Sequence, residues 1–472
     1  MLFNSLSFAV FLPIVFCIYW ALRKSLRGQN TLLLIASYIF YGWWDARFLS
    51  LIFASTVVDF SLGLFIANSD SIKRRKLLLL ASMVFNLSLL GVFKYYNFFL
   101  ENFIELTSSI GVQTSLKLLS VVLPVGISFY TFQTMSYTID IYRKKLNPTK
   151  DFVAFATFVG YFPQLVAGPI ERASNLLPQI IKPRIFDYSK SVDGLRQALW
   201  GFFKKVVIAD VVAPLVDQTF TDPLSYEASA LVAGAILFSI QIYCDFSGYS
   251  DIAIGISKLF GIELKQNFRT PYFSRDIAEF WRRWHISLST WFRDYLYIPM
   301  GGSRGSIILK VRNTLLIFIV SGFWHGANWT FIIWGLINAL LFLPLLIADR
   351  NRINLDLPSF EDLHKIAFTF LITTLAWVFF RADSVSQALE YINGIIINTG
   401  GDTLKIKWSL LIYITILLFG DWVGRKHDFT LNFLNEGIFK QHTFLRFAIY
   451  ISLAYLILLN IGSQQSFIYF QF

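Results

Sequence analysis

The sequence predicts an all-α integral membrane protein that crosses the bilayer many times. Of its 472 residues, 55% are hydrophobic and only 15% are charged. So little polar surface cannot cover a soluble domain of this size. Apolar runs long enough to cross a membrane recur along the chain, and basic clusters separate them. The charge of +11 falls in these clusters and not in a basic module with interleaved aromatic residues, so nucleic acid is excluded as a partner.

The first 150 residues contain five predicted crossings. They are expected at residues 6–22, 31–44 and 47–67, at 77–98, and in a run that ends near Tyr142. Basic clusters follow the first, third and fifth crossings, whereas the loops between them are neutral or acidic. By the positive-inside rule, this alternation places the N-terminus outside the cytoplasm. The first run is not preceded by a basic region or followed by a small-residue cleavage site, so we expect a retained helix.

The next part of the chain departs from this pattern. Residues 152–168 end in a proline- and glycine-containing stretch, which predicts a broken or re-entrant segment in a pocket wall. A short helix on the cytoplasmic face is the alternative. The segment 192–216 carries Lys204 and Lys205 near its middle. These lysines either line a pocket or extend from a shallow helix to the interface, and the second interpretation is favoured.

A crossing at 228–244 leads into the longest polar-rich part, residues 245–306. It opens with Asp245-Phe246-Ser247-Gly248-Tyr249-Ser250-Asp251. Asp245 and Asp251 are candidates to orient a histidine, or they are helix caps in a Ser-Gly turn. Further on, Trp281, His285 and Leu288 fall on one face of a predicted cytoplasmic helix.

Positive charge accompanies this predicted helix. Arg282 and Arg283 lie within it, and the surrounding stretch has an excess of Lys and Arg. Such a stretch suits an anionic headgroup, a phosphorylated thioester carrier or the anionic membrane leaflet. The sequence does not choose between a coenzyme phosphate and the leaflet.

The main candidate for chemistry is His325. It lies in Phe323-Trp324-His325-Gly326-Ala327-Asn328-Trp329, at the end of an apolar run over 307–323. A titratable imidazole inside an almost uncharged membrane segment is costly, which indicates a functional site. Imidazole has the pKa of a general base at neutral pH, and Asn328 is a candidate hydrogen-bond donor to an acyl oxygen.

The rest of the chain predicts further crossings at 329–347, 366–380, 408–424 and 443–461, with an outer amphipathic stretch at 384–398. The total is about eleven or twelve, and both termini are expected outside. We treat residues 1–472 as a single membrane domain made of N-terminal helices (1–150), a catalytic core (151–347) and C-terminal helices (348–472).

Neither a metal nor a tightly bound cofactor is expected. Cys17 and Cys244 lie far apart in apolar runs, so they support neither a disulfide framework nor a thiolate metal site. His285 and His325 lack a third ligand nearby in sequence.

Together these motifs resemble the membrane-bound O-acyltransferase family, in particular its bacterial alginate and peptidoglycan O-acetyltransferase branch. The likeness rests on the segment from Asp245 to Asp251, the stretch from Arg269 to Arg304, and Phe323-Trp324-His325-Gly326 followed by Trp329. It extends over nearly the whole chain, from Met1 to the closing Phe467-Ile468-Tyr469-Phe470.

The resemblance implies a ring of helices around a central tunnel, in the inner membrane of a bacterium. A cytoplasmic thioester such as acetyl-CoA would donate an acyl group, which leaves on the other side through an extracytoplasmic acetyltransferase or SGNH-type partner. The acceptor would be an exported polysaccharide, reached indirectly, and membrane lipid surrounds the protein. His325 matches the catalytic histidine and His285 a second polar residue on the cytoplasmic approach. Donor-binding or supporting roles would fall to Trp324, Trp281, Arg282, Arg283, Asp245 and Asp251.

His285 is open to three roles: orienting the thioester, protonating the leaving thiolate or capping a packed helix. Two other functions also stay open. A transporter of a lipid-linked or small polar solute would place titratable groups and broken helices at mid-membrane, although we find no inverted repeat. A non-catalytic scaffold would recruit an outer acyltransferase.

Overall fold

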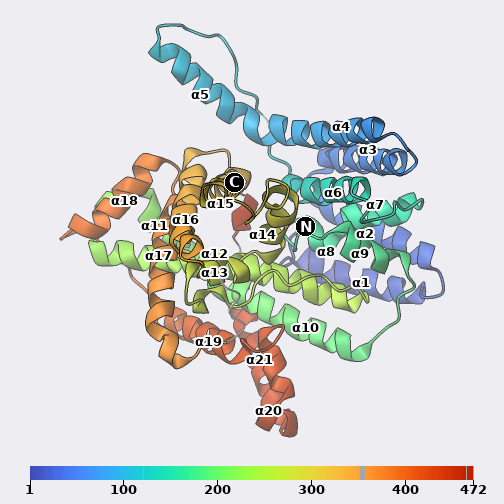
Figure 1. The fold of residues 1–472 in the computed structure, drawn as a ribbon. Coiled ribbons are helices and arrows are strands. Elements are labelled where there is room, and N and C mark those ends of the chain that lie inside the picture. Colours follow the sequence, from blue (N-terminus) through green and yellow to red (C-terminus); the bar gives the residue numbers. More distant parts are fainter. Residues whose placement is uncertain (121, 351–356, 464, 471–472) are drawn as a thin grey trace. The chain divides into compact units, whose positions relative to one another are not determined.

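The protein is built from α-helices, as shown by a computed structural model (Figure 1). The structure describes residues 1–120, 122–350, 357–463 and 465–470. Within these ranges no β-strand forms, and the single extended pairing is an isolated bridge between Tyr226 and Asp402. The all-α prediction is therefore confirmed.

Many of these helices are suited to a bilayer. In the part of the chain that the structure describes, seven helical stretches are long and apolar enough to cross: Leu26–Ala67, Ile72–Ser109, Ala228–Leu259, Ile307–His325, Trp329–Ile347, Phe360–Arg381 and Thr443–Asn460. Three shorter apolar helices lie at Leu6–Ala21, Phe152–Leu165 and Trp408–Gly424. The protein is thus a polytopic membrane protein.

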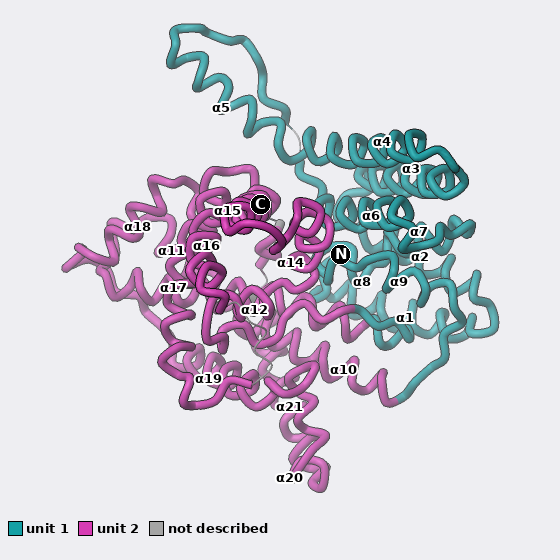
Figure 2. Tube along the Cα trace, in the orientation of Figure 1, with its two compact units in different colours: residues 1–188, 257–264 teal, residues 189–256, 265–472 magenta. Residues whose placement is uncertain are grey.

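The chain divides into two compact units (Figure 2). Unit 1 comprises residues 1–188 and 257–264, and unit 2 comprises residues 189–256 and 265–472. Each unit therefore combines segments that are distant in sequence.

Unit 1 is an assembly of apolar helices with a buried polar centre. Asp59 is fully buried and accepts hydrogen bonds from Ser82 Oγ (2.5 Å) and Asn86 Nδ2 (2.8 Å). These bonds satisfy a carboxyl that would otherwise be costly to bury. The helices are α1 (Leu6–Ala21), α2 (Leu26–Asp45), α3 (Leu49–Ala67), α4 (Ile72–Leu90), α5 (Tyr96–Ser109), α6 (Ile127–Tyr142), α7 (Phe152–Gly160), α8 (Phe162–Leu165) and α9 (Ala173–Ile181).

The expected break after residue 152 is present. The chain leaves the helical conformation at Tyr161 (ψ 109°), between α7 and the single turn of α8, which contains Pro163. Phe155, Phe158 and Phe162 are fully buried within unit 1. The broken backbone is therefore enclosed by protein, as irregular backbone at membrane depth must be.

Unit 2 contains the three motifs on which the family resemblance rests, at residues 245–251, 269–304 and 323–329. Its elements are α10 (Tyr188–Phe202), a π-helical turn η3 (Phe203–Ala209), α11 (Asp210–Thr221), α12 (Ala228–Leu259, ending in unit 1), α13 (Ile277–Arg283), α14 (Ile286–Phe292), α15 (Ile307–His325), α16 (Trp329–Ile347), α17 (Leu363–Arg381), α18 (Val385–Ile397), α19 (Trp408–Gly424), α20 (Gly437–Gln441) and α21 (Thr443–Asn460). The predicted bounds 329–347 and 408–424 agree with α16 and α19.

Two predictions about the polar-rich part are wrong. Helix α12 does not end near 244 but continues to Leu259, so Asp245 and Asp251 lie inside a helix and do not cap a Ser-Gly turn. The expected continuous helix over residues 280–291 is also interrupted. Trp284 is extended and His285 adopts a left-handed conformation (φ 43°), which separates α13 from α14.

Candidate active site

His325 is placed by a tight helical hairpin. It is the last residue of α15, and α15 packs closely against α16. A Cβ on Gly322 would approach the Phe331 carbonyl oxygen to 2.2 Å, and one on Gly335 would approach the Phe318 carbonyl oxygen to 2.4 Å. Glycine at both positions therefore lets the two helices touch backbone to backbone.

Aromatic rings enclose the His325 side chain, which is 3% exposed. The ring centroids of Trp324, Trp334 and Phe380 lie 5.0, 5.2 and 5.4 Å from that of the imidazole. Gly326 belongs to the same enclosure, because a Cβ there would lie 2.1 Å from the Phe331 ring. The wall excludes bulk water from the histidine, which strengthens electrostatic interactions there.

His285 lies at the break between α13 and α14 and is also buried, at 1% exposure. Its Nδ1 is 3.1 Å from Asn267 Oδ1. That oxygen also accepts from the hydroxyl of Ser287 (2.8 Å), while Asn267 Nδ2 donates to Ser250 Oγ (3.2 Å). The network assigns the proton of neutral His285 to Nδ1 and leaves Nε2 as its acceptor nitrogen.

Burial also fixes the charge of His285. It lowers the pKa of His285 to about 3, because the buried imidazolium loses its solvation by water. At neutral pH the ring is uncharged, and its one N–H is directed to Asn267. This arrangement favours an orienting or accepting role over protonation of a leaving thiolate.

The two histidines share one enclosure. Their ring centroids lie 6.3 Å apart, and Trp324 approaches both, at 5.0 Å from His325 and 6.2 Å from His285. Tyr469 does the same, at 5.7 and 6.4 Å. The sequence analysis did not select Tyr469 as a site residue, because no local spacing connects it with residues 285 or 325.

A polar cavity of about 400 Å³ adjoins this enclosure within unit 2. Six lysine and arginine residues line it against three carboxylates, Asp251, Glu279 and Asp428. The basic residues are Lys204, Arg269, Arg282, Arg283, Arg425 and Lys426. The excess of positive charge suits an anionic ligand.

The cavity and the histidines share a short stretch of chain. Asn267 forms the hydrogen bond with His285. The next residue, Phe268, has its ring centroid 6.4 Å from that of His285 and also lines the cavity. Arg269, which follows it, lines the cavity as well. On α13, Arg283 lines the cavity, two residues before His285. A ligand in the cavity therefore lies next to the segments that place His285.

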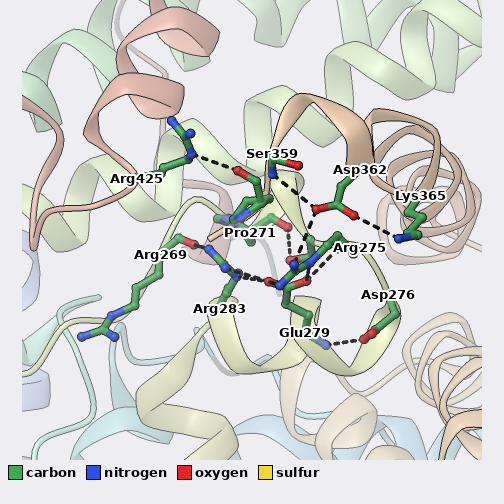
Figure 3. A network of polar contacts seen from close by, with 12 residues as sticks. Arg269, Pro271, Arg275, Asp276, Glu279, Arg283, Ser359, Asp362, Lys365 and Arg425 are labelled. Carbon is green, nitrogen blue, oxygen red and sulfur yellow. Dashed lines mark hydrogen bonds and ion pairs between the residues drawn. The ribbon is translucent and has the colours of Figure 1, made fainter. Parts of the chain in front are cut away.

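Ion pairs hold this rim in place (Figure 3). Glu279 accepts from Arg275 Nε (3.0 Å) and from Arg283 NH2 (2.7 Å), and Asp276 caps α13 by accepting from the Glu279 N–H (2.7 Å). Burial would raise the pKa of Glu279, but the hydrogen bonds from Arg275 and the charge of Arg283 outweigh it and hold the pKa below its usual range. Arg283 also donates to the Arg269 carbonyl (3.3 Å), which connects the helix to the cavity wall.

Lys204 and Lys205 do not extend to the interface, so that prediction is wrong. They are 2% and 5% exposed, because the π-helical turn η3 directs consecutive side chains inward. Lys204 pairs with Asp251 (2.5 Å), whereas Lys205 pairs with Asp210 (2.8 Å) and Asp245 (2.7 Å). Asp245 therefore holds a lysine and does not orient a histidine.

Close contact between α10 and α12 makes these pairs possible. A Cβ on Gly201 would lie 2.6 Å from the Gly248 carbonyl oxygen, and one on Gly255 would lie 2.3 Å from the Gly194 carbonyl oxygen. Glycines spaced seven apart on both helices thus form a matched crossing. Just after it, η3 meets the acidic face of α12.

The other predicted residues separate into two groups. Trp281 packs on Trp334, 5.7 Å between centroids, so it supports the wall behind His325. Arg282 and Arg283 both line the cavity. Asn328 instead begins α16: its Oδ1 accepts from the Thr330 N–H (3.0 Å), and its Nδ2 donates to the Asp383 carbonyl (2.9 Å). That engagement gives Asn328 a structural role in place of the expected donation to an acyl oxygen.

Across the described residues, no group of three His, Cys, Asp or Glu side chains is arranged to hold a metal.

The chain is thus a polytopic helical membrane protein with two buried imidazoles and a cationic cavity. The match to known families makes this specific: residues 143–380 match the model of the membrane-bound O-acyltransferase family, and the chain belongs to that family. It is therefore an acyltransferase.

Its relatives include enzymes that modify cell-surface polymers. The chain is 39% identical over 469 residues to the "probable alginate O-acetylase" of Azotobacter vinelandii, covering 98% of this chain and 85% of that protein. It is 42% identical over 392 residues to the protein of the same name from Pseudomonas aeruginosa, covering 82% of this chain and 73% of that one. It is 36% identical over 429 residues to the "peptidoglycan O-acetyltransferase" of Helicobacter pylori, covering 84% and 80%.

Proposed function

We propose that this acyltransferase takes an acetyl group from a cytoplasmic thioester and passes it across the inner membrane for O-acetylation of an exported polysaccharide. The observation that carries the proposal is the pair of buried histidines 6.3 Å apart next to the cationic cavity. The names of the relatives support acetyl as the acyl group and a surface glycan such as alginate or peptidoglycan as the final acceptor.

His325 acts as the general base in this proposal. As the oxygen of the acceptor hydroxyl bonds to the thioester carbonyl carbon, the imidazole takes the hydroxyl proton. The carbon–sulfur bond then breaks, and sulfur leaves with the bonding electrons as a thiolate. His285 is neutral and faces the same enclosure, where it orients the donor.

The cavity binds the phosphorylated end of the donor. Coenzyme A carries phosphate groups at one end and the thioester at the other, so binding of the phosphates by Arg269, Arg282 and Lys426 directs the thioester inward. A phosphopantetheine carrier has the same chemistry with fewer charges. The positive-inside rule supports a cytoplasmic position for the cationic rim. An extracytoplasmic partner completes transfer to the glycan.

The test is the O-acetyl content of surface polysaccharide in cells that carry His325→Ala, with membrane levels of the protein matched to wild type. We expect a loss of at least about 100-fold, because a positioned base contributes about 10²–10⁴-fold. The control is His364→Ala, at an exposed position on α17. Acetylation that persists in His325→Ala would contradict the mechanism and favour a scaffold or transporter.

A further inference from the structure

Lys205, Asp210 and Asp245 form a buried ion-pair cluster that has no part in the proposed mechanism. Lys205, Asp210 and Asp245 are each at most 5% exposed, and the lysine pairs with both carboxylates. Burying three charges costs solvation that an apolar replacement would avoid. A cluster of this kind therefore calls for a role other than packing.

Both members of one ion pair also bind the same distant stretch of backbone. Lys205 Nζ donates to the Gln465 carbonyl (3.3 Å), and Asp245 Oδ2 accepts from the Ile468 N–H (2.7 Å). Lys205 Nζ thus pairs with two carboxylates, at 2.8 Å from Asp210 Oδ1 and 2.7 Å from Asp245 Oδ1, while it donates to this carbonyl. Two hydrogen bonds therefore connect the cluster with residues 465–469, here called the docked segment.

The docked segment reaches the two histidines. Phe467 is 1% exposed and packs on Tyr249, at 5.0 Å between centroids, and its ring stacks on Tyr469 at 5.6 Å. Tyr469 in turn lies 5.7 Å from His325 and 6.4 Å from His285. The charges hold one part of the segment, and the next residues close the aromatic enclosure.

We propose that Lys205 and Asp245 form a latch that holds residues 465–469 against His285 and His325 and so positions both imidazoles for acyl transfer. The two residues are positioning residues, since they act through the docked segment. Both hydrogen bonds involve backbone atoms of the docked segment, so the latch fixes the position of its backbone independently of its side chains. The catalytic half of this inference rests on the proposed function, whereas the docking half does not.

The experiment measures hydrogen–deuterium exchange of peptides covering residues 465–470 in the purified full-length protein, in wild type and Asp245→Ala. This variant removes the acceptor of the Ile468 N–H and leaves Lys205 paired with Asp210. We expect exchange in the docked segment to rise at least about tenfold, the effect of losing one charged hydrogen bond. The control is Asp421→Ala, which removes another buried carboxylate, one that accepts hydrogen bonds from Tyr243 and Thr430. In this variant, residues 465–470 should exchange as in wild type.

Membrane vesicles with the same variants, prepared from cells that make the acceptor polysaccharide, give the functional readout, which is thiol release from acetyl-CoA. We expect Asp245→Ala to lower kcat about tenfold or more and to leave KM for acetyl-CoA within about twofold, because Asp245 does not line the cavity. If Asp245→Ala does not accumulate, Asp245→Asn is measured instead, with a smaller rise in exchange because an acceptor oxygen remains. Unchanged exchange in the folded variant overturns the latch, and raised exchange with unchanged kcat overturns its positioning role. An inactive wild type would contradict the proposed function and leave the exchange result valid.

Discussion

The imidazoles of His285 and His325 lie 6.3 Å apart, with their planes inclined by 59°. One stands at a break between two short helices, and the other ends a long membrane helix. Trp324 approaches both rings, so a shift of one histidine changes the wall of the other. The pair should therefore respond to mutation as a unit.

The hydrogen bond between His285 and Asn267 provides the first test of that unit. We expect His285→Ala and Asn267→Ala each to lower acetyl transfer about 10- to 100-fold, because the first removes the ring and the second frees its orientation. The double variant should be no worse than the more damaging single variant. The measurement is O-acetyl content at matched membrane abundance, and losses that simply multiply would refute the coupling.

Acid should destabilise the protein through His285. Its folded-state pKa is about 3, below the ordinary value of about 6.5, so only the unfolded chain takes up this proton in that window. Stability therefore falls as pH drops from about 6.5 towards 3, by up to about 1.4 kcal/mol per pH unit for this group. Thermal unfolding in detergent at pH 7.5 and 5.5 should show a larger decrease for wild type than for His285→Gln. Equal decreases would mean that His285 is not buried in its neutral form.

The cationic cavity should govern donor affinity more than turnover. Arg269 and Lys426 line it and are exposed, so Arg269→Gln and Lys426→Gln should fold normally. We expect each to raise KM for acetyl-CoA about tenfold with little change in kcat, since each removes a charged contact to phosphate. Arg304→Gln, at an exposed position outside the cavity, is the matched control. A fall in kcat at constant KM would place the donor elsewhere.

The Glu279 carboxylate should stabilise the rim of the cavity. Glu279→Gln leaves Arg275 and Arg283 without their common partner, and we expect a loss of about 3 kcal/mol, seen as a lower Tm. Because the pKa of Glu279 is held below its usual range, this stabilisation is complete above about pH 4.5 and is lost as pH falls through the folded-state pKa. Glu361→Gln, an exposed neighbour in the ion-pair region, should leave Tm unchanged.

Long apolar helices and His325 were accessible from the sequence. The bounds of α16 followed from hydropathy, because an apolar run with polar flanks has few alternatives in a bilayer. His325 stood out because a titratable group in such a run is rare. These predictions depended on local pattern alone.

Contacts between segments that are distant in the chain could not be predicted from the sequence. The interface prediction for Lys205 failed because a π-helical turn and the close approach of α10 and α12 bring it to Asp245. No local sequence pattern indicates that turn. Two lysines in an apolar run, together with the aspartates of the segment 245–251, could still have indicated buried ion pairs. Tyr469 was missed for the same reason, since only the folded chain brings it to the histidines.

Helix α12 is longer than a membrane requires. Its 32 residues extend about 48 Å, whereas the hydrocarbon core measures about 30 Å. Without tilt, more than one turn of α12 would extend beyond the lipid tails. The acidic residues Asp245 and Asp251 occupy its second half. This single helical rod thus carries both carboxylates, Asp251 and Asp245, that pair with Lys204 and Lys205. Thinner or thicker bilayers would move that rod relative to the headgroups, so lipid chain length becomes a variable that can tune this enzyme.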